Sequence, residues 1–325
     1  MPQFPFLLVA VAAKDYLANM NSRKLRIGTR GSPLALVQAR ETQSRLMAAL
    51  NRPEADFEII PIKTTGDMVR DRPLNELGGK GLFTKELEEA LLDGRIDVAV
   101  HSMKDMPAHM PPGLMIGAVL PREDVRDAFI SLLASSLRDL PKQAALGSSS
   151  VRRTAQALRL RPDLRPVPFR GNVETRLQKL RDGAADATFL AAAGLNRLGL
   201  ADRITALIEV EDMLPAVAQG AIAVQIAEAQ EVVAGEVSKV DHAESRVAVE
   251  CERAFMAALD GSCRTPIAGH AILKGNRIFF RGEALTLDGR HVFTATREGA
   301  PGDAAKMGLD AGIEVKAKGG ALIAS

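Results

Sequence analysis

Residues 97–107, Asp-Val-Ala-Val-His-Ser-Met-Lys-Asp-Met-Pro, combine an apolar run with several side chains that could do chemistry. The run 96–100 predicts a buried strand, and the polar residues after it predict a turn at 101–105 that carries Lys104 and Asp105. Active sites of open α/β sheets collect just beyond the carboxyl ends of strands. A lysine beside an aspartate at such a place suggests a charged group held ready for reaction. An ordinary solvated loop would have the same composition, so this segment alone leaves both interpretations open.

Three predicted strand ends combine small polar residues with arginine. They are 29–33 (Thr-Arg-Gly-Ser-Pro), 147–153 (Gly-Ser-Ser-Ser-Val-Arg-Arg) and 169–176 (Phe-Arg-Gly-Asn-Val-Glu-Thr-Arg). Backbone N–H groups at a helix N-terminus, together with hydroxyls and guanidinium groups, bind anions. Helix caps alone would explain the serines, but three such ends exceed what a structural role requires. The pattern predicts a site for phosphate, sulfate or carboxylate.

The charge distribution agrees with an anionic partner. The chain has 325 residues and a net charge of +2, but residues 147–203 hold eleven Lys and Arg against five acidic residues. Guanidinium groups match carboxylate and phosphate with a rigid fork of donors. Solvated helix faces would account for part of this excess. A nucleic-acid partner is disfavoured because the chain has no tryptophan and one tyrosine to stack on bases.

A glycine-rich turn at 78–83, Gly-Gly-Lys-Gly-Leu-Phe, carries Lys80. It lacks the Gly-Lys-Ser/Thr that opens the helix of a nucleotide-binding loop. A mobile cover, or a lysine that contacts a carboxylate, is the better interpretation.

The two cysteines occupy different settings. Cys263 lies in a Gly/Ser turn at 260–266, where a surface position would suit a reactive or derivatised thiol, and no nearby histidine supports a Cys–His nucleophile. Cys251 lies within an expected helix and is interpreted as a small buried hydrophobe. Two cysteines and five scattered histidines predict neither a disulfide framework nor a metal site.

The elements that must position these residues alternate between strands and amphipathic helices from residue 25 to about 227, which predicts mostly parallel sheets covered by helices. Strands are expected at 25–28, 57–62, 127–131, 144–147, 167–169, 186–191 and 221–227. Helices are expected from Ser32-Pro33, over 83–93, over 151–161 and over 172–181. The architecture starts anew after Pro121, so a second domain of the same kind is predicted.

The last third of the chain has a different pattern. A polar stretch at 228–241 without a clean period is expected to be a linker. A helix at 243–259 follows it, then strands at 267–273, 277–287 and 291–296, with Asp288-Gly289 as a hairpin turn, and a final helix opened by Pro301. Helix, antiparallel strands and helix predict a separate α+β domain.

The N-terminal residues 1–21 are expected to be a poorly ordered extension. Their apolar stretch 4–13 is too short to span a bilayer, and no basic residue precedes it as in a signal peptide. No membrane association is predicted, and a reducing, cytoplasmic setting is the expectation.

Seven motifs then carry a resemblance that covers about residues 25–308. They are 26–36 (Arg-Ile-Gly-Thr-Arg-Gly-Ser-Pro-Leu-Ala-Leu), 78–88, 100–107, 122–129 (Arg-Glu-Asp-Val-Arg-Asp-Ala-Phe), 170–176, 214–221 (Leu-Pro-Ala-Val-Ala-Gln-Gly-Ala) and the Cys263 loop. In this order they resemble the porphobilinogen deaminase (hydroxymethylbilane synthase) family. Two departures are small: Ser262 and Ala218 stand where many members have glycine.

The resemblance implies two doubly wound α/β domains like those of type II periplasmic binding proteins, followed by a C-terminal α+β domain. Domain 1, with the catalytic residue, is expected over 22–120 and 216–238, and domain 2, with anion-binding groups, over 121–215. Domain 3, with the cofactor cysteine, is expected over 242–325. Movement between the first two domains is expected near 118–126 and 215–221.

The implied activity is that of a transferase that acts on porphobilinogen. Four porphobilinogen units add stepwise to a dipyrromethane cofactor held by a thioether to Cys263; each loses ammonia, and water releases hydroxymethylbilane. Asp105 is the implied catalytic carboxylate, since an ionised aspartate near pyrrole N–H groups stabilises the cation formed as ammonia leaves. A monomer without a metal is expected.

The resemblance also implies a set of residues that bind the acetate and propionate arms of the substrate and cofactor. The set comprises Arg30, Ser32, Lys80, Ser102, Lys104, Ser148, Ser149, Ser150, Arg152, Arg153, Arg170, Gly171, Arg176 and Arg197. The alternative is a non-enzymatic, two-lobed anion-binding protein. A cysteine placed in a third domain and the lack of a convincing export signal argue against that alternative.

Overall fold

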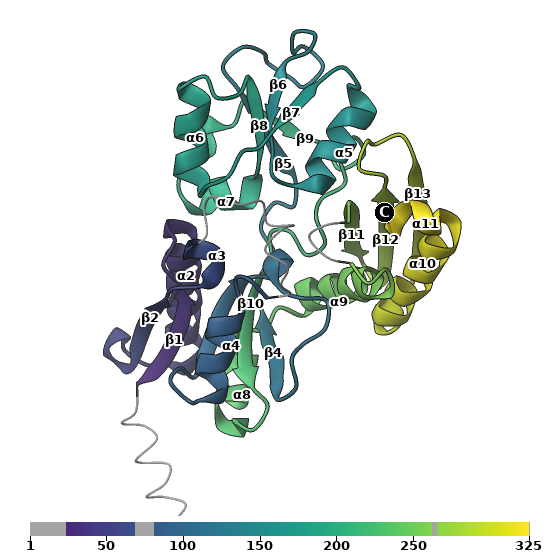
Figure 1. Ribbon diagram of the computed structural model, residues 1–325. Helices are drawn as coiled ribbons and strands as arrows, with labels where there is room; N and C mark the ends of the chain where they lie inside the picture. Colours follow the sequence, from purple (N-terminus) through teal and green to yellow (C-terminus); the bar gives the residue numbers. More distant parts are fainter. Residues whose placement is uncertain (1–23, 69–80, 262–264, 325) are drawn as a thin grey trace, which may run out of the picture.

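The computed structural model describes residues 24–68, 81–261 and 265–324. It shows two α/β lobes, one above the other, with a third unit beside them (Figure 1). The expected fold class, two α/β domains and a C-terminal α+β domain, is confirmed. Residues 1–21, Lys80 and Cys263 lie outside the described residues.

The sheet of the first lobe has the strand order β2-β1-β3-β10-β4. Its strands are β1 (Leu25–Arg30), β2 (Phe57–Ile62), β3 (Val98–Ser102), β4 (Leu114–Val119) and β10 (Ile222–Ala227). Strands β1, β2 and β3 are parallel, whereas β10 is antiparallel to both β3 and β4. The segment around β10 therefore returns to the first sheet after the chain has built the second lobe.

The helices of the first lobe are α2 (Pro33–Leu50), α3 (Thr65–Met68), α4 (Lys85–Leu92) and α8 (Glu231–Val237). As predicted, Ser32 caps α2 and Pro33 is its first residue. The helix expected from residue 83 begins two residues later. The linker expected at 228–241 is wrong, because α8 occupies it and buries Val237 in the core of the first lobe.

The second lobe repeats this arrangement with the order β7-β6-β8-β5-β9. Its strands are β5 (Asp127–Ser131), β6 (Ala145–Gly147), β7 (Arg165–Val167), β8 (Ala187–Ala191) and β9 (Ala206–Ile208). Strands β6, β7 and β8 are parallel, and β5 is antiparallel to β8 and β9. Strand β5 therefore occupies the place that β10 has in the first lobe.

The second lobe has three helices, α5 (Val151–Leu160), α6 (Val173–Arg181) and α7 (Ala192–Arg197). The strand expected at 167–169 ends at residue 167 instead. Phe169 lies beyond it and is buried so closely over Gly147 that a Cβ there would lie 2.6 Å from the ring. This contact requires glycine at position 147.

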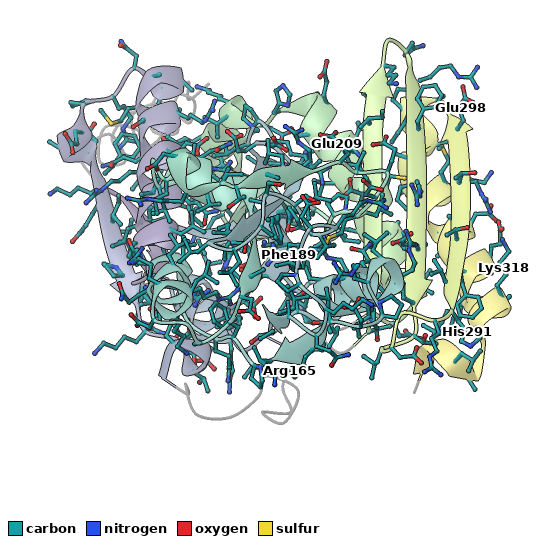
Figure 2. The ribbon with its side chains drawn as sticks, turned by 90° about the horizontal axis from the view of Figure 1, so that it is seen from above. Arg165, Phe189, Glu209, His291, Glu298 and Lys318 are labelled. Carbon is teal, nitrogen blue, oxygen red and sulfur yellow. The ribbon has the colours of Figure 1, made fainter. Side chains whose placement is uncertain are left out.

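In the described part of the third domain, one α-helix comes before the three strands in the chain and two α-helices come after them. The elements are α9 (Ala243–Ala258), β11 (Ile267–Lys274), β12 (Arg277–Leu285), β13 (Val292–Gly299), α10 (Ala304–Gly319) and α11 (Ala321–Ala324). The three strands form an antiparallel sheet in sequence order. Seen from above, this sheet stands at the rim of the molecule with His291, Glu298 and Lys318, while Phe189 lies near the centre of the view (Figure 2).

Candidate active site

The loop after β3 carries Lys104 and Asp105. His101 and Ser102 belong to β3 itself, so the turn expected at 101–105 is shorter and consists of the 3-10 helix Met103–Asp105. Met103 is buried, and its backbone N–H donates to the carbonyl of Ala221 at 3.0 Å. This anchor leaves Lys104 half-buried and Asp105 exposed.

His101 is excluded as a general acid or base near neutral pH. The ring is buried, and its Nε2 lies 3.0 Å from Oε1 of Gln225. Burial lowers the pKa of His101 to about 4, although the bond to Gln225 acts in the opposite direction. The imidazole is therefore neutral at pH 7 and serves the packing beneath the loop.

A pocket in the first lobe is lined by Arg30, Ser32, Phe83, Ser102 and Asp105, among others. Arg30 forms an ion pair with Asp67, and its guanidinium lies 4.1 Å from the centre of the Phe83 ring. Burial alone would raise the pKa of Asp67, but the bonds from Arg30 and Thr64 lower it. Arg30 is thus held flat against the pocket wall by an ion pair and a cation–π contact.

Two further polar groups of this pocket are tied to the scaffold. The Ser32 hydroxyl accepts the backbone N–H of Ala35 at 3.4 Å as the cap of α2. Ser102 and the buried Gln38 exchange hydrogen bonds of 2.9 and 3.1 Å. Asp67 and Gln38 carry no local signal in the sequence, because each becomes a partner only through the fold.

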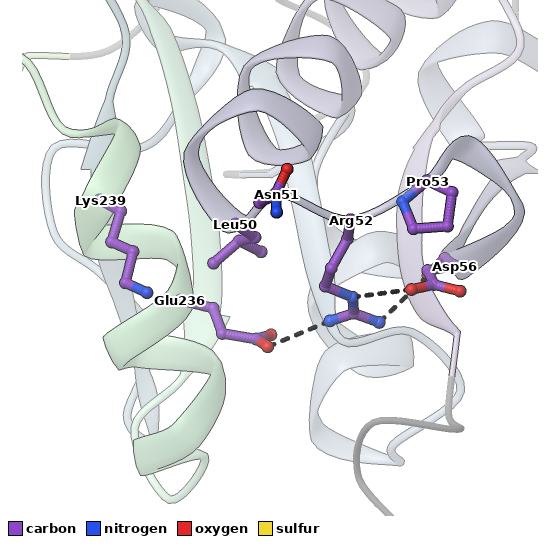
Figure 3. A pocket seen from close by; sticks show the side chains of 7 residues that line it. All are labelled: Leu50, Asn51, Arg52, Pro53, Asp56, Glu236 and Lys239. Atoms are coloured by element: carbon purple, nitrogen blue, oxygen red, sulfur yellow. Dashed lines mark hydrogen bonds and ion pairs between the residues drawn. The ribbon is translucent and has the colours of Figure 1, made fainter.

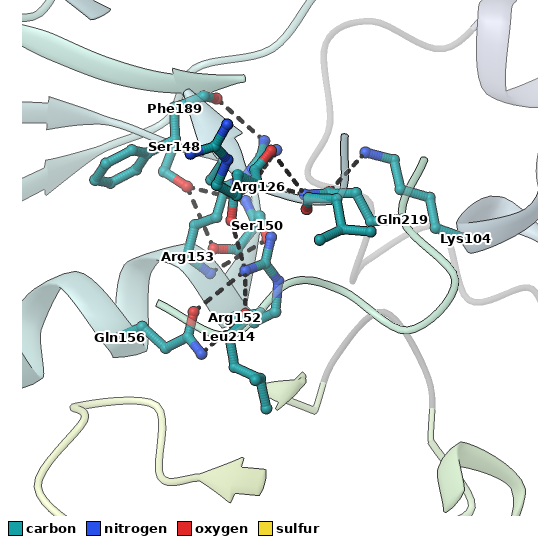
Figure 4. A network of polar contacts seen from close by, with 12 residues as sticks. Lys104, Arg126, Ser148, Ser150, Arg152, Arg153, Gln156, Phe189, Leu214 and Gln219 are labelled. Atoms are coloured by element: carbon teal, nitrogen blue, oxygen red, sulfur yellow. Dashed lines mark hydrogen bonds and ion pairs between the residues drawn. The ribbon is translucent and has the colours of Figure 1, made fainter. Parts of the chain in front are cut away.

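Arg152 and Arg153 lie in the second lobe and both bind Asp127 (Figure 4). Nη1 of Arg152 donates to Oδ2 of Asp127 at 2.7 Å and to the carbonyl of Leu214 at 2.8 Å. Nε and Nη2 of Arg153 donate to Oδ1 of Asp127 at 3.0 and 2.7 Å. Burial would raise the pKa of Asp127, but the two guanidinium groups outweigh it and hold that pKa well below its usual range. Sequence analysis missed Asp127.

The three serines before α5 brace their own turn. The Ser148 hydroxyl accepts the N–H of Ser150 at 3.1 Å, and the Ser150 hydroxyl accepts the N–H of Arg153 at 3.4 Å as the helix cap. The Ser149 hydroxyl accepts the N–H of Phe169 at 3.2 Å. The bond to Ser149 joins the strand ends of β6 and β7, both of which carry predicted anion-binding residues.

Arg170 and Arg176 follow β7 in the chain: Arg170 lies in the turn after the strand, and Arg176 lies in helix α6. Nη1 of Arg170 is buried without a hydrogen-bond partner among the described residues. Nε of Arg176 donates to the carbonyl of Gly171 at 2.8 Å. The pKa of Arg176 is lowered to about 10, chiefly by burial and also by Arg153 and Arg170, while Asp105 acts in the opposite direction. The charge of Asp105 therefore acts across the lobes on Arg176.

Arg197 has a different environment from the other arginines of the predicted set. Its Nε donates to Oε2 of Glu41 at 3.0 Å, and its Nη1 donates to the carbonyl of Gly220 at 3.0 Å. Glu41 lies on α2, so this ion pair connects α7 of the second lobe with a helix of the first.

Comparison with known proteins agrees with this geometry. A family model described as "Porphobilinogen deaminase, dipyromethane cofactor binding domain" matches residues 25–235, and one described as "Porphobilinogen deaminase, C-terminal domain" matches residues 247–317. The chain belongs to the porphobilinogen deaminase family.

Relatives in the porphobilinogen deaminase family span almost the whole chain. The porphobilinogen deaminase of Nitrobacter hamburgensis is 54% identical over 294 residues, which cover 90% of this chain and 93% of the relative. The chloroplastic porphobilinogen deaminase of Oryza sativa is 52% identical over 302 residues, 91% of this chain and 84% of the relative. Among solved structures, the VFT2 domain of Bordetella pertussis BvgS matches 70% of this chain and 89% of its own with 16% identity and a TM-score of 0.41.

A second pocket lies at the far end of the first lobe, away from Asp105. It is lined by Leu50, Asn51, Arg52, Pro53, Asp56, Glu236 and Lys239 (Figure 3). Arg52 already binds Asp56 at 3.2 Å and Glu236 at 3.1 Å, so its guanidinium group is engaged by acidic residues that line the same pocket. Within the described ranges, no cluster of three or more His, Cys, Asp or Glu could hold a metal ion, and no helix is long and apolar enough to cross a membrane.

Proposed function

We propose that the protein condenses four porphobilinogen molecules stepwise onto a dipyrromethane primer, releases one ammonia at each step, and then frees hydroxymethylbilane by hydrolysis. Membership of the family, with relatives more than half identical over nine-tenths of the chain, supports this reaction. The observation that carries the proposal is the position of Asp105. It is an exposed carboxylate that lines the first-lobe pocket, and its charge acts against the lowering of the pKa of Arg153 and Arg176 in the opposite lobe.

Asp105 is the proposed catalytic residue. Departure of ammonia leaves positive charge on the substrate pyrrole, and a fixed carboxylate beside the ring stabilises that charge. The same carboxylate can accept a hydrogen bond from the pyrrole N–H and orient the ring for attack. Its place at the end of a 3-10 helix anchored by Met103 keeps the carboxylate at the pocket of the first lobe.

The arginines of the second lobe are proposed to hold the substrate's acetate and propionate arms. Arg170 offers a buried, unpartnered Nη1, and Arg176 uses only its Nε inside the protein according to the described hydrogen bonds. Both can therefore receive a carboxylate without breaking an ion pair. Arg153 and Arg30 contribute from the walls, since each already shares an internal carboxylate.

The remaining members of the predicted set are proposed to support the site. Arg152 holds Asp127 and the carbonyl of Leu214, and Arg197 holds Glu41 and the carbonyl of Gly220. These contacts position neighbouring elements. Further support is proposed for the remaining donors of the set, namely Ser32, Ser102, Lys104, Ser148, Ser149, Ser150 and Gly171 together with Lys80, which lies outside the described residues.

The donor set fits the family's dipyrromethane cofactor. A group that carries several carboxylates needs cationic donors without an internal counter-ion, and the orphaned Nη1 of Arg170 is such a donor in the part of the chain the structure describes. Cys263 is the proposed point of thioether attachment. When bound, the cofactor supplies the pyrrole carbon to which the first substrate is joined. The residues named above then bind, orient and neutralise.

Intact mass measured before and after addition of porphobilinogen tests the proposal. The expected result is a covalent excess that fits two pyrrole rings, a ladder of adducts after substrate is added, and loss of both in Cys263→Ser. Asp105→Asn should retain the excess but consume porphobilinogen slower by several orders of magnitude. Protein that carries no covalent excess and releases no ammonia would support the two-lobed anion-binding alternative. We further infer a monomer in the cytoplasm, which gel filtration and fractionation test.

A further inference from the structure

Gln219 lies at the centre of a chain of hydrogen bonds that crosses between the lobes. Nζ of Lys104, in the first lobe, donates to Oε1 of Gln219 at 3.1 Å. Nε2 of Gln219 donates to Oδ1 of Asp127 at 3.0 Å, and the same Oδ1 accepts from Arg153 in the second lobe. Figure 4 shows Lys104 and Gln219 on one side of this network and Arg152 and Arg153 on the other. We call the series Lys104–Gln219–Asp127–Arg153 the bridge.

The chemistry of the bridge requires at its centre a side chain that both accepts and donates hydrogen bonds. An ammonium group only donates and an ionised carboxylate only accepts, so the side chain between them must accept on one side and donate on the other. Gln219 does both, and its amide orientation is fixed because Nε2 also donates to the carbonyl of Val125 at 2.8 Å. Gln219 and Asp127 are both completely buried, so water cannot substitute for either partner.

The backbone at Gln219 is held in an unusual shape. Ala218 and Gly220, on either side of it, have φ values of +59° and +89°. The left-handed region disfavours residues with a Cβ, so the surrounding structure must impose it at Ala218. The N–H of Ala218 donates to Glu252 at 2.6 Å, and the carbonyl of Gln219 accepts from Arg122 at 2.8 Å. These contacts fix the direction in which the Gln219 side chain leaves the chain.

The bridge also balances charge behind the candidate reaction residues. Asp127 binds both Arg152 and Arg153. Its charge also acts on the ammonium group of Lys104. The pKa of Lys104 is lowered to about 8, chiefly by burial and also by Arg153 and Arg152, while Asp105 and Asp127 act in the opposite direction. Without the charge of Asp127, three cations would repel one another next to Asp105.

We propose that Asp127 and Gln219 are positioning residues that hold the ammonium of Lys104, beside the catalytic Asp105, in register with the guanidinium of Arg153 across the two lobes. This inference rests on the proposed function for the role of Asp105, but the geometry of the bridge stands independently of turnover. The bridge keeps the donors on both lobes charged and oriented before any substrate arrives. Preorganised charge of this kind is what lowers a barrier that involves a developing cation.

The test is the titration of Lys104 in holoprotein, measured by acetic anhydride labelling between about pH 6 and about pH 10 and peptide mass spectrometry. Asp127→Asn removes a negative charge near the ammonium, so the labelling midpoint should move to lower pH. Gln219→Met removes the acceptor of Lys104 and should move the midpoint in the same direction. Gln219→Glu places a carboxylate against the ammonium and should move it to higher pH. The opposite signs at one position separate the bridge from a general loss of structure.

Asp97→Asn is the matched control. Asp97 is also buried and binds an arginine, Arg26, at 2.7 Å, but it lies before β3, at the opposite end of that strand from Lys104. Its loss should destabilise the fold and leave the Lys104 midpoint unchanged. In porphobilinogen turnover, Asp127→Asn and Gln219→Met should lower kcat about tenfold or more and move the alkaline limb of the pH profile to lower pH. Asp97→Asn should do neither.

Coincident Lys104 midpoints in wild type, Gln219→Met and Gln219→Glu would overturn the bridge, whatever their stability. If Asp127→Asn does not fold, the two Gln219 variants decide the outcome. Labelling needs no turnover, so signed midpoint shifts in a protein that never consumes porphobilinogen would refute the proposed function and leave the bridge in place.

Discussion

Glu252 and Arg122 form a buried, two-pronged ion pair that joins the third domain to both segments that cross between the lobes. Nη1 and Nη2 of Arg122 donate to the two carboxylate oxygens of Glu252 at 2.6 and 3.0 Å. The same oxygens accept the backbone N–H groups of Ala271, in β11, and Ala218 at 2.7 and 2.6 Å. Glu252 has no exposed surface, so its carboxylate oxygens are satisfied by these four hydrogen bonds and not by bulk water.

Glu252→Gln should therefore destabilise the protein strongly. The change leaves Arg122 buried without a counter-ion and turns one acceptor into a donor that faces an N–H group. Breaking a buried pair from one side costs about 3–5 kcal/mol, measured as the free energy of unfolding in urea. Asp260→Asn is the control, since its pair with Lys316 is exposed and should contribute about 1 kcal/mol at most. Equal losses in the two variants would contradict the central role of Glu252.

Gly220→Ala should also destabilise the fold, for a reason of backbone geometry. Gly220 has φ +89°, and a Cβ there would collide with the carbonyl oxygen of Glu123 in the other crossing segment. Gly183→Ala is the matched control because Gly183 has φ +76° with nothing within 4 Å of its Cβ. The control should cost about 1–2 kcal/mol from the left-handed backbone alone, and Gly220→Ala should cost clearly more. Unfolding curves of the two variants that superimpose would refute this prediction.

The elements around the site were largely predictable because their signals are local. Ser32 and Pro33 start α2, and Asn172 caps α6 by accepting the N–H of Thr175 at 2.8 Å, each within four residues of sequence. Strand β4 was not predicted, since it follows two prolines and contains Gly117, which weaken the local strand signal. Helix α8 was missed because its stability comes from one buried face rather than from a clean period.

The partners within the site were not predictable from local sequence. Arg152 and Arg153 were expected to offer their donors to an external anion, but Asp127, about 25 residues earlier, already binds both. The ion pair of Arg197 with Glu41 joins residues 156 positions apart. Such pairs depend on how the two lobes meet, and a single sequence contains no period or cap that records it.

His101→Gln should change how stability depends on pH. In wild type, the unfolded imidazole takes a proton near its ordinary pKa of about 6.5, whereas the buried ring does so only at about 4. Wild type should therefore lose stability relative to the variant as the pH falls from about 6.5 to about 4, and the difference should be constant above that window. Urea unfolding at several pH values measures it, with the exposed His109→Gln as the control. A wild-type-minus-variant difference that stays flat throughout would contradict the buried, neutral imidazole.

Glu41→Gln should loosen the contact between the lobes. Arg197 loses its ionised partner on α2, while its bond to the carbonyl of Gly220 remains. Faster hydrogen exchange is expected over α2 and α7, with a loss of about 1–2 kcal/mol in unfolding free energy for a hydrogen bond to a charged group. Arg45→Ala removes the exposed ion pair that Glu41 also makes. This control should leave hydrogen exchange over α2 and α7 unchanged and the free energy of unfolding within about 0.5 kcal/mol of wild type. Unchanged exchange in Glu41→Gln would show that this pair does not hold the lobes together.

Arg170→Ala should reduce activity without a matching loss of stability. Its Nη1 is buried and has no hydrogen-bond partner within the described part of the chain, so truncation removes an unsatisfied group rather than a stabilising bond. A substrate carboxylate bound by this guanidinium contributes about 1.5–3 kcal/mol, which corresponds to a loss of about 10- to 150-fold in kcat/KM. Early adducts should accumulate in the intact-mass ladder as elongation stalls.

Arg165→Ala is the matched control for that variant, since Arg165 is an exposed arginine on the neighbouring β7 and should leave turnover unchanged. Arg170→Lys keeps the charge but loses the planar fork, so it should recover only part of the rate. The order wild type, lysine, alanine in kcat/KM, with nearly equal unfolding free energies, separates recognition of a carboxylate from support of the fold. Normal elongation in Arg170→Ala would remove Arg170 from the substrate-binding set and leave Arg176 as the second-lobe arginine proposed to hold the substrate carboxylate.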